Sequence, residues 1–294
     1  MTARQPQSSG LLYVVATPIG NLRDMTPRAV EVLQQVDCIA AEDTRHSAPL
    51  LQHFQITTPM VAYHEHNERD LAPSLVKRML AGEQIALISD AGTPLLSDPG
   101  FHLVCAAQKG GIVIVPIPGA NAVACALSAC GLPCDRFVFE GFLPAKSAAR
   151  QTHLASLRDD DRTLVFYESP HRIVETLADL ATLFGGERRA VLGRELTKLH
   201  ETFLHDTLDG LLARVKADAN QRRGECTLIV EGAPKTTEQT QREVRAKEIF
   251  AILAKELPAS RAVALAAEIA GTRKNALYAL LIGEEGKAYE TSMT

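Results

Sequence analysis

Apolar runs alternate with segments of helical spacing through the first part of the chain. The apolar runs are "LLYVVA" (11–16), "CIAAE" (38–42), "QIALIS" (84–89) and "IVIVP" (112–116). Between them lie the helical segments "TPRAVEVLQQV" (26–36), "SLVKRML" (74–80) and "FHLVCAAQ" (101–108). Strands that are apolar throughout and separated by helices are typical of a parallel sheet covered on both faces. The pattern predicts a flexible extension over residues 1–10 and an α/β domain over 11–131.

The pattern changes beyond residue 131. Strand candidates follow at "RFVFEGF" (136–142), "TLVFYES" (163–169), "AVLGREL" (190–196), "ETFLHDT" (201–207) and "CTLIVEG" (226–232), with helices expected at 148–158, 171–184 and 208–219. Two successive strands around Arg194 and Phe203 predict a hairpin and hence a mixed sheet. We therefore expect a second α/β domain over 132–233. A polar linker, "PKTTEQTQ", then leads to a helical tail over 241–284 with helix-turn-helix-like spacing.

Composition and charge narrow the classes of function. The 294 residues are enough for two domains, and 46% hydrophobic with 22% charged residues is globular. A net charge of -4 gives no general basic surface, so nucleic acid binding would need a local patch. The charge-free stretch 110–134 is interrupted by Pro116, Pro118 and Gly119, which favours a buried strand, a turn and a packed helix over a membrane span.

The cysteines and the N-terminus point to the cytoplasm. No C-x-x-C pair is present, so we expect no metal and interpret all six cysteines as buried thiols. They are Cys38, Cys105, Cys125, Cys130, Cys134 and Cys226. The first ten residues are polar and lack the apolar core of a signal peptide.

Polar and glycine-bearing loops follow most of the predicted strands. They are "ATPIGN" (16–21), "AEDTRHS" (41–47), "ISDAGTPLLSDPG" (88–100) and "PIPGANA" (116–122), then "YESPHR" (167–172) and "GRELTKLHE" (193–201). Ligands of open α/β sheets bind beyond the carboxyl ends of the strands. The crevice between the two domains is therefore the expected site. In the loop 88–100 no lysine follows the glycines and no G-x-G-x-x-G occurs, which excludes a triphosphate cradle and a dinucleotide fingerprint.

These loops, together with "HEHNE" (64–68) and "LIVEG" (228–232), resemble the ribosomal small-subunit RNA methyltransferase I family of the tetrapyrrole methylase superfamily. The resemblance runs from residue 11 to 232, and the tail is similar to that of longer members. It implies two α/β domains with S-adenosylmethionine between them, a homodimer, and methylation of a ribose 2′-oxygen of a cytidine in 16S rRNA. It also implies cofactor contacts by Pro18, Asp90, Ala91, Gly92, Thr93, Pro94, Ser97, Gly119, Ala120, Asn121, Ala122 and Tyr167.

The chemistry of the loops agrees with that resemblance. A cradle of backbone groups, small residues and carboxylates without lysine suits the sulfonium and zwitterionic head of S-adenosylmethionine. A ribose hydroxyl is a poor nucleophile, so a proton acceptor would help. The candidates are Glu42, Asp43, His66, Glu168 and Glu195, among which the sequence does not select. Contacts to RNA are expected from Arg45, Arg172, Arg194 and Lys198.

Two alternatives remain open at this stage. A tetrapyrrole or diphthamide-type methylase would share fold and cofactor, although charged loops do not suit a broad porphyrinoid pocket. A non-catalytic RNA-binding or ribosome-assembly module would use the tail helices alone and would not bind S-adenosylmethionine. We expect the tail to help seat the RNA through its Lys and Arg residues. Because the chain is acidic overall, we also expect it to act on the assembled small subunit rather than on naked RNA.

Overall fold

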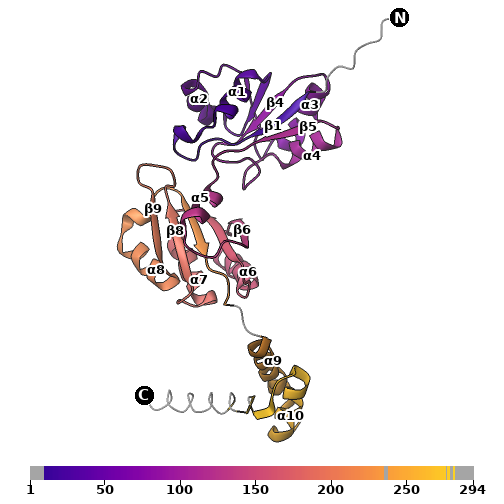
Figure 1. Ribbon diagram of the computed structural model, residues 1–294, viewed down its shortest axis with the longest axis vertical. Coiled ribbons are helices and arrows are strands. Elements are labelled where there is room, and N and C mark those ends of the chain that lie inside the picture. Colours follow the sequence, from indigo (N-terminus) through magenta and orange to yellow (C-terminus); the bar gives the residue numbers. More distant parts are fainter. Residues whose placement is uncertain (1–9, 235–237, 276, 279–280, 282–294) are drawn as a thin grey trace, which may run out of the picture. The chain divides into compact units, whose positions relative to one another are not determined.

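The structure is a computed structural model that describes residues 10–234, 238–275, 277–278 and 281. The chain divides into two compact units, Met1–Ala233 and Pro234–Thr294, which we describe separately (Figure 1). The predicted extension lies outside the described residues except for Gly10. That residue is buried and donates its N–H to the Met79 carbonyl at 2.8 Å.

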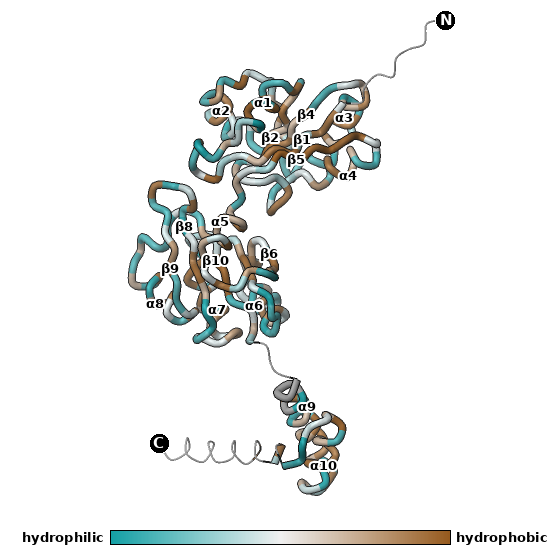
Figure 2. Tube along the Cα trace, viewed as in Figure 1, coloured by the Kyte–Doolittle hydropathy of each residue, from teal (hydrophilic) through white to brown (hydrophobic). Residues whose placement is uncertain are grey.

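The first domain contains a five-stranded parallel sheet of order β3-β2-β4-β1-β5. Its strands are β1 (Leu11–Val15), β2 (Cys38–Ala41), β3 (Met60–Ala62), β4 (Ile85–Ile88) and β5 (Val113–Ile117). Figure 2 shows the apolar residues concentrated on these central strands. The strand β5 was expected to be buried, but it lies at the sheet edge and exposes Val113. That prediction was wrong because burial at an edge depends on neighbours that the strand's own apolar sequence does not specify.

Helices cover both faces of this sheet, as the apolar strands predicted. They are α1 (Pro27–Gln35), α2 (Thr44–His53), α3 (Glu68–Leu80), α4 (Phe101–Lys109) and the short η1 (Leu22–Asp24). One core contains Leu33 of α1 and Leu51 of α2, and the other contains Leu75 of α3 and Leu103 of α4. The helix α1 begins where its sequence indicates, because the Thr26 side chain accepts a hydrogen bond from the Ala29 N–H.

The second domain has a mixed sheet of order β6-β7-β10-β8-β9. Its strands are β6 (Phe137–Phe142), β7 (Thr163–Glu168), β8 (Arg189–Arg194), β9 (Thr202–Thr207) and β10 (Cys226–Val230). The helices α6 (Ser147–Leu157), α7 (Ile173–Phe184) and α8 (Leu208–Ala217), with the short η2 (Ala219–Arg222), complete the domain. The predicted β8–β9 hairpin is confirmed, and the helices pack on one face of the sheet around Phe166 and Leu177.

The helix α5 (Ala122–Ala129) covers the other face of the second sheet. Its Val123 and Leu127 pack in one core with Val191 of β8 and Ile229 of β10. Because α5 directly follows the last strand of the first domain, this packing fixes the carboxyl ends of the first sheet next to the second domain.

The second unit consists of helices within the part that the structure describes. The helices α9 (Glu238–Leu253) and α10 (Ala259–Ala270) pack around Ala246, Val263 and Leu277. Gly271 ends α10 with a left-handed φ of 67°. The third helical segment of the predicted tail falls partly outside the described residues.

The expectation that all six cysteines are buried is confirmed for three of them. Cys134 is exposed and Cys105 and Cys125 are half-buried, so the prediction of six buried thiols was wrong for these three. Cys105 and Cys125 lie in α4 and α5, and Cys134 lies in the loop between α5 and β6. The apolar or small residues around them in the sequence do not show which side of each segment faces solvent. Over the described ranges, none of the helices has both the length and the apolarity that spanning a membrane requires.

Candidate active site between the two α/β domains

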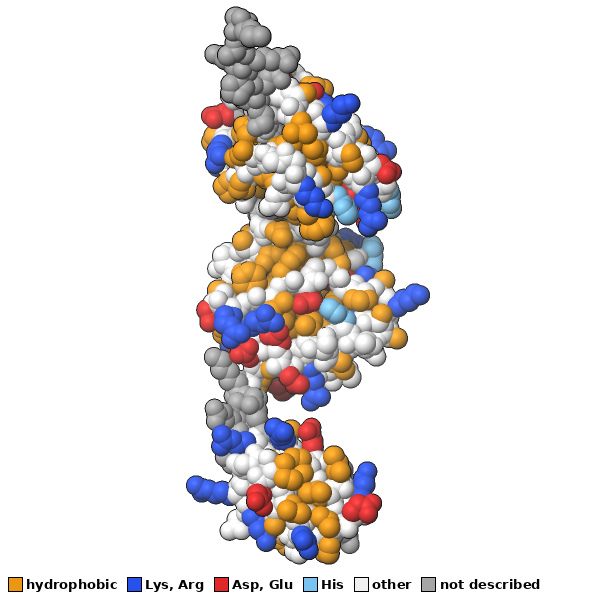
Figure 3. Space-filling model, turned by 90° about the vertical axis from the view of Figure 1, so that its right-hand side faces the viewer, with side chains coloured by type: hydrophobic (Ala, Val, Ile, Leu, Met, Phe, Trp, Pro, Cys, Tyr) orange, Lys and Arg blue, Asp and Glu red, His pale blue; other side chains and the backbone are white. Residues whose placement is uncertain are grey.

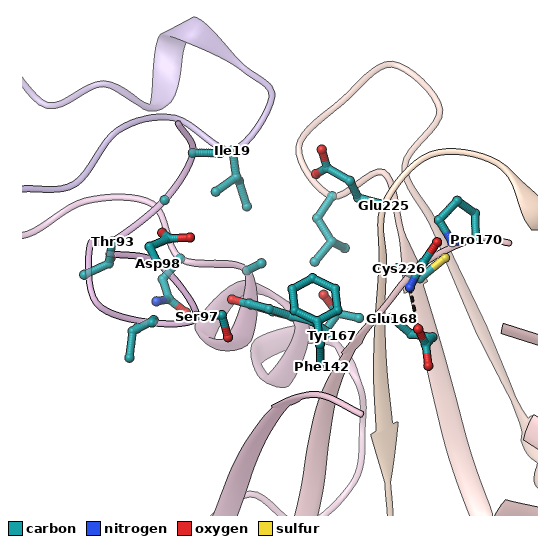
Figure 4. Close-up of a pocket in the computed structure, with 18 residues that line it drawn as sticks. Ile19, Thr93, Ser97, Asp98, Phe142, Tyr167, Glu168, Pro170, Glu225 and Cys226 are labelled. Carbon is teal, nitrogen blue, oxygen red and sulfur yellow. Dashed lines mark hydrogen bonds between the residues drawn. The ribbon is translucent and has the colours of Figure 1, made fainter. Parts of the chain in front are cut away.

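A cavity of about 380 Å³ lies between the two domains of the first unit. The first domain and α5 line it with Ile19, Ala91, Gly92, Thr93, Leu96, Ser97, Asp98, Asn121 and Ala122. The second domain lines it with Phe142, Tyr167, Glu168, Ser169, Pro170, Leu196, Glu225, Cys226 and Thr227. Figure 4 shows the two groups of side chains facing each other across the cavity.

The loop between β4 and α4 forms the first wall largely through its backbone. Gly92 has a φ of 82° and exchanges two backbone hydrogen bonds with Thr17, at 2.8 and 3.0 Å. A Cβ at Gly92 would lie 3.3 Å from Ile19 Cγ2. Leu95 and Ser97 also have positive φ, which is uncommon for residues other than glycine. The loop is therefore held in a specific conformation that local sequence preference alone would not favour.

The loop between β5 and α5 is tied to the same wall. Thr93 Oγ1 donates to the Ala120 carbonyl at 3.2 Å, and Asn121 Oδ1 accepts from the Ala124 N–H at 3.0 Å, which caps α5. A Cβ at Gly119 would lie 2.9 Å from the Ala16 Cβ, so only glycine permits this approach to the end of β1.

A group of carboxylates lies behind the loop. The Asp43 N–H donates to Asp90 Oδ1 at 3.0 Å, and the Asp90 N–H donates to Glu42 Oε2 at 3.3 Å. Burial raises the pKa of Asp98 to about 6, and the negative charges of Glu42 and Asp90 add to that rise. Burial also raises the pKa of Glu42. Of the four carboxylates, Asp98 lines the cavity.

The second wall is aromatic and apolar. Tyr167 extends from β7 toward Ser97 (Figure 4), and burial raises the pKa of its hydroxyl to about 12, with a further contribution from the Asp98 charge. Its ring centroid lies 4.8 Å from that of Phe139 and 5.6 Å from that of Phe142. Leu196 lines the same side of the cavity.

The structure brings most of the predicted cofactor contacts to one place. Those that line the cavity are Ala91, Gly92, Thr93, Ser97, Asn121, Ala122 and Tyr167. The others, Pro18, Asp90, Pro94, Gly119 and Ala120, belong to the same loops but are not among the residues that line it. Gly119 and Asp90 have the packing and hydrogen-bonding roles described above.

The predicted proton acceptors separate from one another. Glu168 lines the cavity, but its side chain is fully buried and accepts from the Ser169 N–H at 2.7 Å, from Arg172 at 3.2 Å and from Thr176 Oγ1 at 2.5 Å (Figure 4 marks the first of these). Asp43, Glu42, His66 and Glu195 do not line it. The Arg45 guanidinium holds the pKa of Asp43 at about 2.

Glu195 is committed to a turn. It has a φ of 49°, and its carboxylate accepts from the Glu225 N–H at 2.9 Å and from Lys198 Nζ at 3.1 Å. Burial alone would raise the pKa of Glu195, but these two donors outweigh burial and the net pKa is lowered. His66 is exposed, with its ring centroid 6.0 Å from that of His64.

The predicted RNA contacts include one that does not fit. Arg194 is 6% exposed and donates to the carbonyls of Asn220, at 2.7 Å, and Arg223, at 3.0 Å. Its guanidinium joins β8 to the segment before β10, so the expectation of a phosphate contact is corrected to a structural role. The sequence could not show this because the acceptors lie 26 and 29 residues away.

The other three predicted RNA contacts are more accessible. Arg45 has a 90% exposed side chain and pairs with Asp43 at 2.9 Å. Arg172 donates to the Leu143 carbonyl at 2.7 Å, and Lys198 lies between Glu195 and Glu225. Arg45 is therefore the least committed of the four.

Sequence reasoning missed Asp98 and Phe142 as site residues. Asp98 lies in the glycine-bearing loop 88–100, which the sequence places after a strand, and that position was a usable signal. Phe142 was assigned only to a strand. Within the described ranges, no group of three or more His, Cys, Asp or Glu is arranged to hold a metal ion.

The helical unit carries charge of both signs. Among the residues of this unit that the structure describes, the exposed basic ones are Arg242, Arg245, Lys255, Arg261, Arg273 and Lys274. On the face drawn in Figure 3, Lys and Arg side chains of this unit lie around a central group of hydrophobic side chains, with Asp and Glu among them. Ile252 and Ile269 are 66% and 58% exposed.

Comparison with known proteins gives close relatives over almost the whole chain. Residues 11–212 match the family described as Tetrapyrrole (Corrin/Porphyrin) Methylases, and residues 240–284 match the RsmI C-terminal HTH domain. The "Ribosomal RNA small subunit methyltransferase I" of Pseudomonas aeruginosa is 55% identical over 283 residues, covering 96% of this chain and all of the relative. The protein of that name from Escherichia coli O157:H7 is 52% identical, covering 95% and 97%.

Solved structures agree on the fold. Uroporphyrin-III C-methyl transferase from Thermus thermophilus, complexed with S-adenyl homocysteine, has a TM-score of 0.53 at 17% identity, covering 76% of this chain and 97% of that one. The predicted fold class, two α/β domains of the tetrapyrrole methylase type followed by helices, is confirmed. The similarity that the loop motifs indicated is confirmed as well, and this chain belongs to the ribosomal RNA small subunit methyltransferase I family.

Proposed function

We propose that this protein transfers a methyl group from S-adenosylmethionine to the ribose 2′-hydroxyl of a cytidine in the 16S rRNA of the small ribosomal subunit. The observation that carries the proposal is the cavity between the two domains, whose first wall is the Gly92 loop, in a chain of this family. The family supports the reaction class, and the cavity supports the place where it occurs.

The residues of the cavity fit S-adenosylmethionine. Its lining holds no Lys or Arg, which disfavours a polyphosphate, while Asp98 and Glu225 favour a ligand with positive charge. The open space in front of Gly92 exists because that residue has no side chain. Ala91 to Thr93, Asn121 and Ala122 would hold the cofactor from one side and Tyr167 from the other. When bound, the cofactor supplies an electrophilic methyl group on its sulfonium.

The residues of the cavity would orient the cofactor and exclude water from the reacting groups. Ile19, Leu196 and Tyr167 give the cavity an apolar lining, which limits competing water near the reacting groups. The hydrogen bonds of Thr17 with Gly92 and of Thr93 with Ala120 fix the loop that would orient the cofactor. Holding two reactants in a reactive geometry accounts for a large part of many catalysed rates.

Asp98 is the proton acceptor that we assign to this reaction. Of the three carboxylates that line the cavity, Glu168 is fully engaged, and Glu225 has a 74% exposed side chain and pairs with Lys198. Asp98 lies in the loop between β4 and α4. A pKa of about 6 suits a base that works near neutral pH. It would take the proton that the ribose hydroxyl loses when its oxygen gains the methyl group.

The role that we propose for the helical unit is to help bind the RNA substrate. Its exposed Arg and Lys residues, which have Glu residues among them, would supply local phosphate contacts in a chain that is acidic overall. The substrate we propose is the assembled or nearly assembled small subunit, in which the target ribose lies in folded RNA.

We also infer a cytoplasmic homodimer, as the family resemblance implies, and light scattering of the purified protein would give its mass in solution.

The test compares three acceptors. Purified protein and labelled S-adenosylmethionine are incubated separately with undermethylated small subunits, with the RNA extracted from them, and with a tetrapyrrole precursor. Digestion and mass spectrometry then identify the product. We expect ribose-methylated cytidine from the subunits and little label elsewhere. Label in the tetrapyrrole or only on a base would contradict the proposed function, and equal labelling of naked RNA would contradict only the requirement for assembly.

A further inference from the structure

Phe142 is a large aromatic residue that the fold leaves exposed at the cavity. Its exposed fraction is 58%, although it is the last residue of β6 and lines the cavity beside Tyr167. The Tyr167 ring lies 5.6 Å away with an interplanar angle of 59°, and Tyr167 in turn contacts Phe139. The Phe142 ring therefore packs against the Tyr167 ring and retains much of its surface for a ligand.

A β-bulge directs Phe142 to this face. The register with β7 pairs Phe139 with Val165, but Gly141 with Phe166 and Phe142 with Tyr167, so one residue is inserted between Phe139 and Gly141. Because side chains alternate along a strand, a regular β6 would place Phe142 on the opposite face, toward the helices. With the bulge, Phe142 shares the face of its partner Tyr167, which lines the cavity.

The bulge also requires its glycine. Gly141 has a φ of 64°, and a Cβ there would lie 3.1 Å from Ser97 Oγ of the facing loop. The second domain thus lies close to the loop after β4 at the glycine of this bulge. Two features that are unfavourable in a regular strand, a left-handed residue and an exposed phenylalanine, occur together beside the cavity.

The chemistry of an exposed, supported phenyl ring indicates a flat partner. Unstacked RNA bases bind proteins by stacking on such rings, and this interaction depends little on which base is present. A cofactor enclosed between the Gly92 loop and Tyr167 would use the inner surfaces of the cavity. Leu96, 39% exposed, adds a second apolar side chain from the facing loop.

We propose that Phe142 is the stacking surface for the base of the nucleotide whose ribose enters the cavity. The inference rests on the proposed function, because it takes the substrate to be RNA. It adds a specific element of substrate recognition in the second domain, separate from the helical unit.

The test uses Phe142→Ala, Phe142→Trp and a matched control, Phe137→Ala. Phe137 lies at the other end of β6, is 45% exposed and does not line the cavity. Affinity for undermethylated small subunits is measured by sedimentation with S-adenosylhomocysteine present. Affinity for S-adenosylmethionine is measured separately by calorimetry, and thermal unfolding checks that each variant is folded.

We expect Phe142→Ala to weaken subunit binding by about 10- to 100-fold, the range that loss of one base–aromatic stack implies. Phe142→Trp should bind subunits within a few-fold of the unaltered protein, and Phe137→Ala should equal it. S-adenosylmethionine affinity should be unchanged in all three. Unaltered subunit binding by Phe142→Ala, or a loss confined to S-adenosylmethionine binding, would overturn the proposal.

The same measurements separate this proposal from the proposed function. If the unaltered protein binds subunits through Phe142 but places no methyl group on a ribose, the proposed reaction fails and the stacking surface remains. If the ribose is methylated and Phe142→Ala binds subunits normally, only the stacking surface fails.

Discussion

The two walls of the cavity are built in different ways. The first wall follows the carboxyl ends of a parallel sheet and presents backbone and small side chains, held by Gly92, Thr93 and Asn121. The second wall lies on a mixed sheet and presents large side chains, above all Tyr167 and Phe142. A backbone wall has a shape fixed by the fold and suits an invariant cofactor, whereas a side-chain wall can change between relatives that act on different acceptors.

The single acidic side chain of the first wall provides the largest expected effect. Asp98→Asn should lower kcat by about 100- to 10,000-fold, the range for losing a general base, while S-adenosylmethionine affinity changes little. In the unaltered protein, Asp98 must be deprotonated to accept a proton, so kcat should fall as the pH drops through about 6. Single-turnover rates between pH 5 and 8 would show both effects.

The control for this variant is its own pH profile. Asp98→Asn should lose the fall near pH 6, because the group that titrates there is gone. A variant with near-normal kcat, or one that keeps the same profile, would remove Asp98 from the reaction and leave the first wall as a binding surface alone.

The backbone character of the first wall is tested at Gly92. Gly92→Val should weaken S-adenosylmethionine binding by at least about 100-fold, because its side chain would occupy the cavity and contact Ile19. Gly111→Val is the matched control. Gly111 also has a positive φ, 70°, but a Cβ there meets nothing within 4 Å, so backbone strain is similar and the cavity is untouched. Equal calorimetric affinity in the two variants would mean that the Gly92 loop does not contact the cofactor.

We expect the helical unit to contribute to RNA binding but not to the binding of S-adenosylmethionine in the cavity. A protein lacking residues 234–294 should keep its S-adenosylmethionine affinity and bind small subunits about 10-fold more weakly at moderate salt, because phosphate contacts are lost. The dependence of the logarithm of affinity on the logarithm of salt concentration should fall by about 0.9 for each contact removed. Filter binding at several salt concentrations measures this slope, and an unchanged slope would argue that the tail contributes nothing to RNA binding.

The smallest expected effect on binding concerns Glu168 in the second wall. Its carboxylate holds Ser169, Arg172 and Thr176, so Glu168→Gln should lower the free energy of unfolding by about 2–3 kcal/mol. S-adenosylmethionine affinity should stay within a few-fold. Glu225→Gln, at an exposed position of the same wall, should leave stability unchanged. Denaturant unfolding of both variants gives the comparison, and a stable Glu168→Gln protein with abolished kcat would instead make Glu168 the proton acceptor.

Local sequence determined much of this protein. The apolar strands, the Thr26 cap and the order of the loops predicted both sheets, and Gly92 marked the loop of the first wall, because periodicity, caps and glycine act over a few residues. The three-residue β3 and the helix α2, which contains Pro49, lacked such a signal and were not singled out. The family motifs likewise depend on short, contiguous stretches.

Only the tertiary structure decided which polar and aromatic side chains remain available. Arg194 was expected to contact RNA, but the carbonyls of Asn220 and Arg223, 26 and 29 residues away, accept hydrogen bonds from it. Glu168 was a candidate proton acceptor, but Ser169, Arg172 and Thr176 donate hydrogen bonds to its carboxylate.

Sequence reasoning assigned no special role to Asp98 and Phe142. In the folded chain, burial raises the pKa of Asp98, and a bulge in β6 places Phe142 at the cavity. For Arg194, Asp98 and Phe142 the physical reason is that hydrogen-bond saturation, desolvation and strand register depend on neighbours that are distant in the sequence and meet only in the folded chain. For Glu168 the partners are close in the sequence, and only the turn into α7 brings them onto its carboxylate.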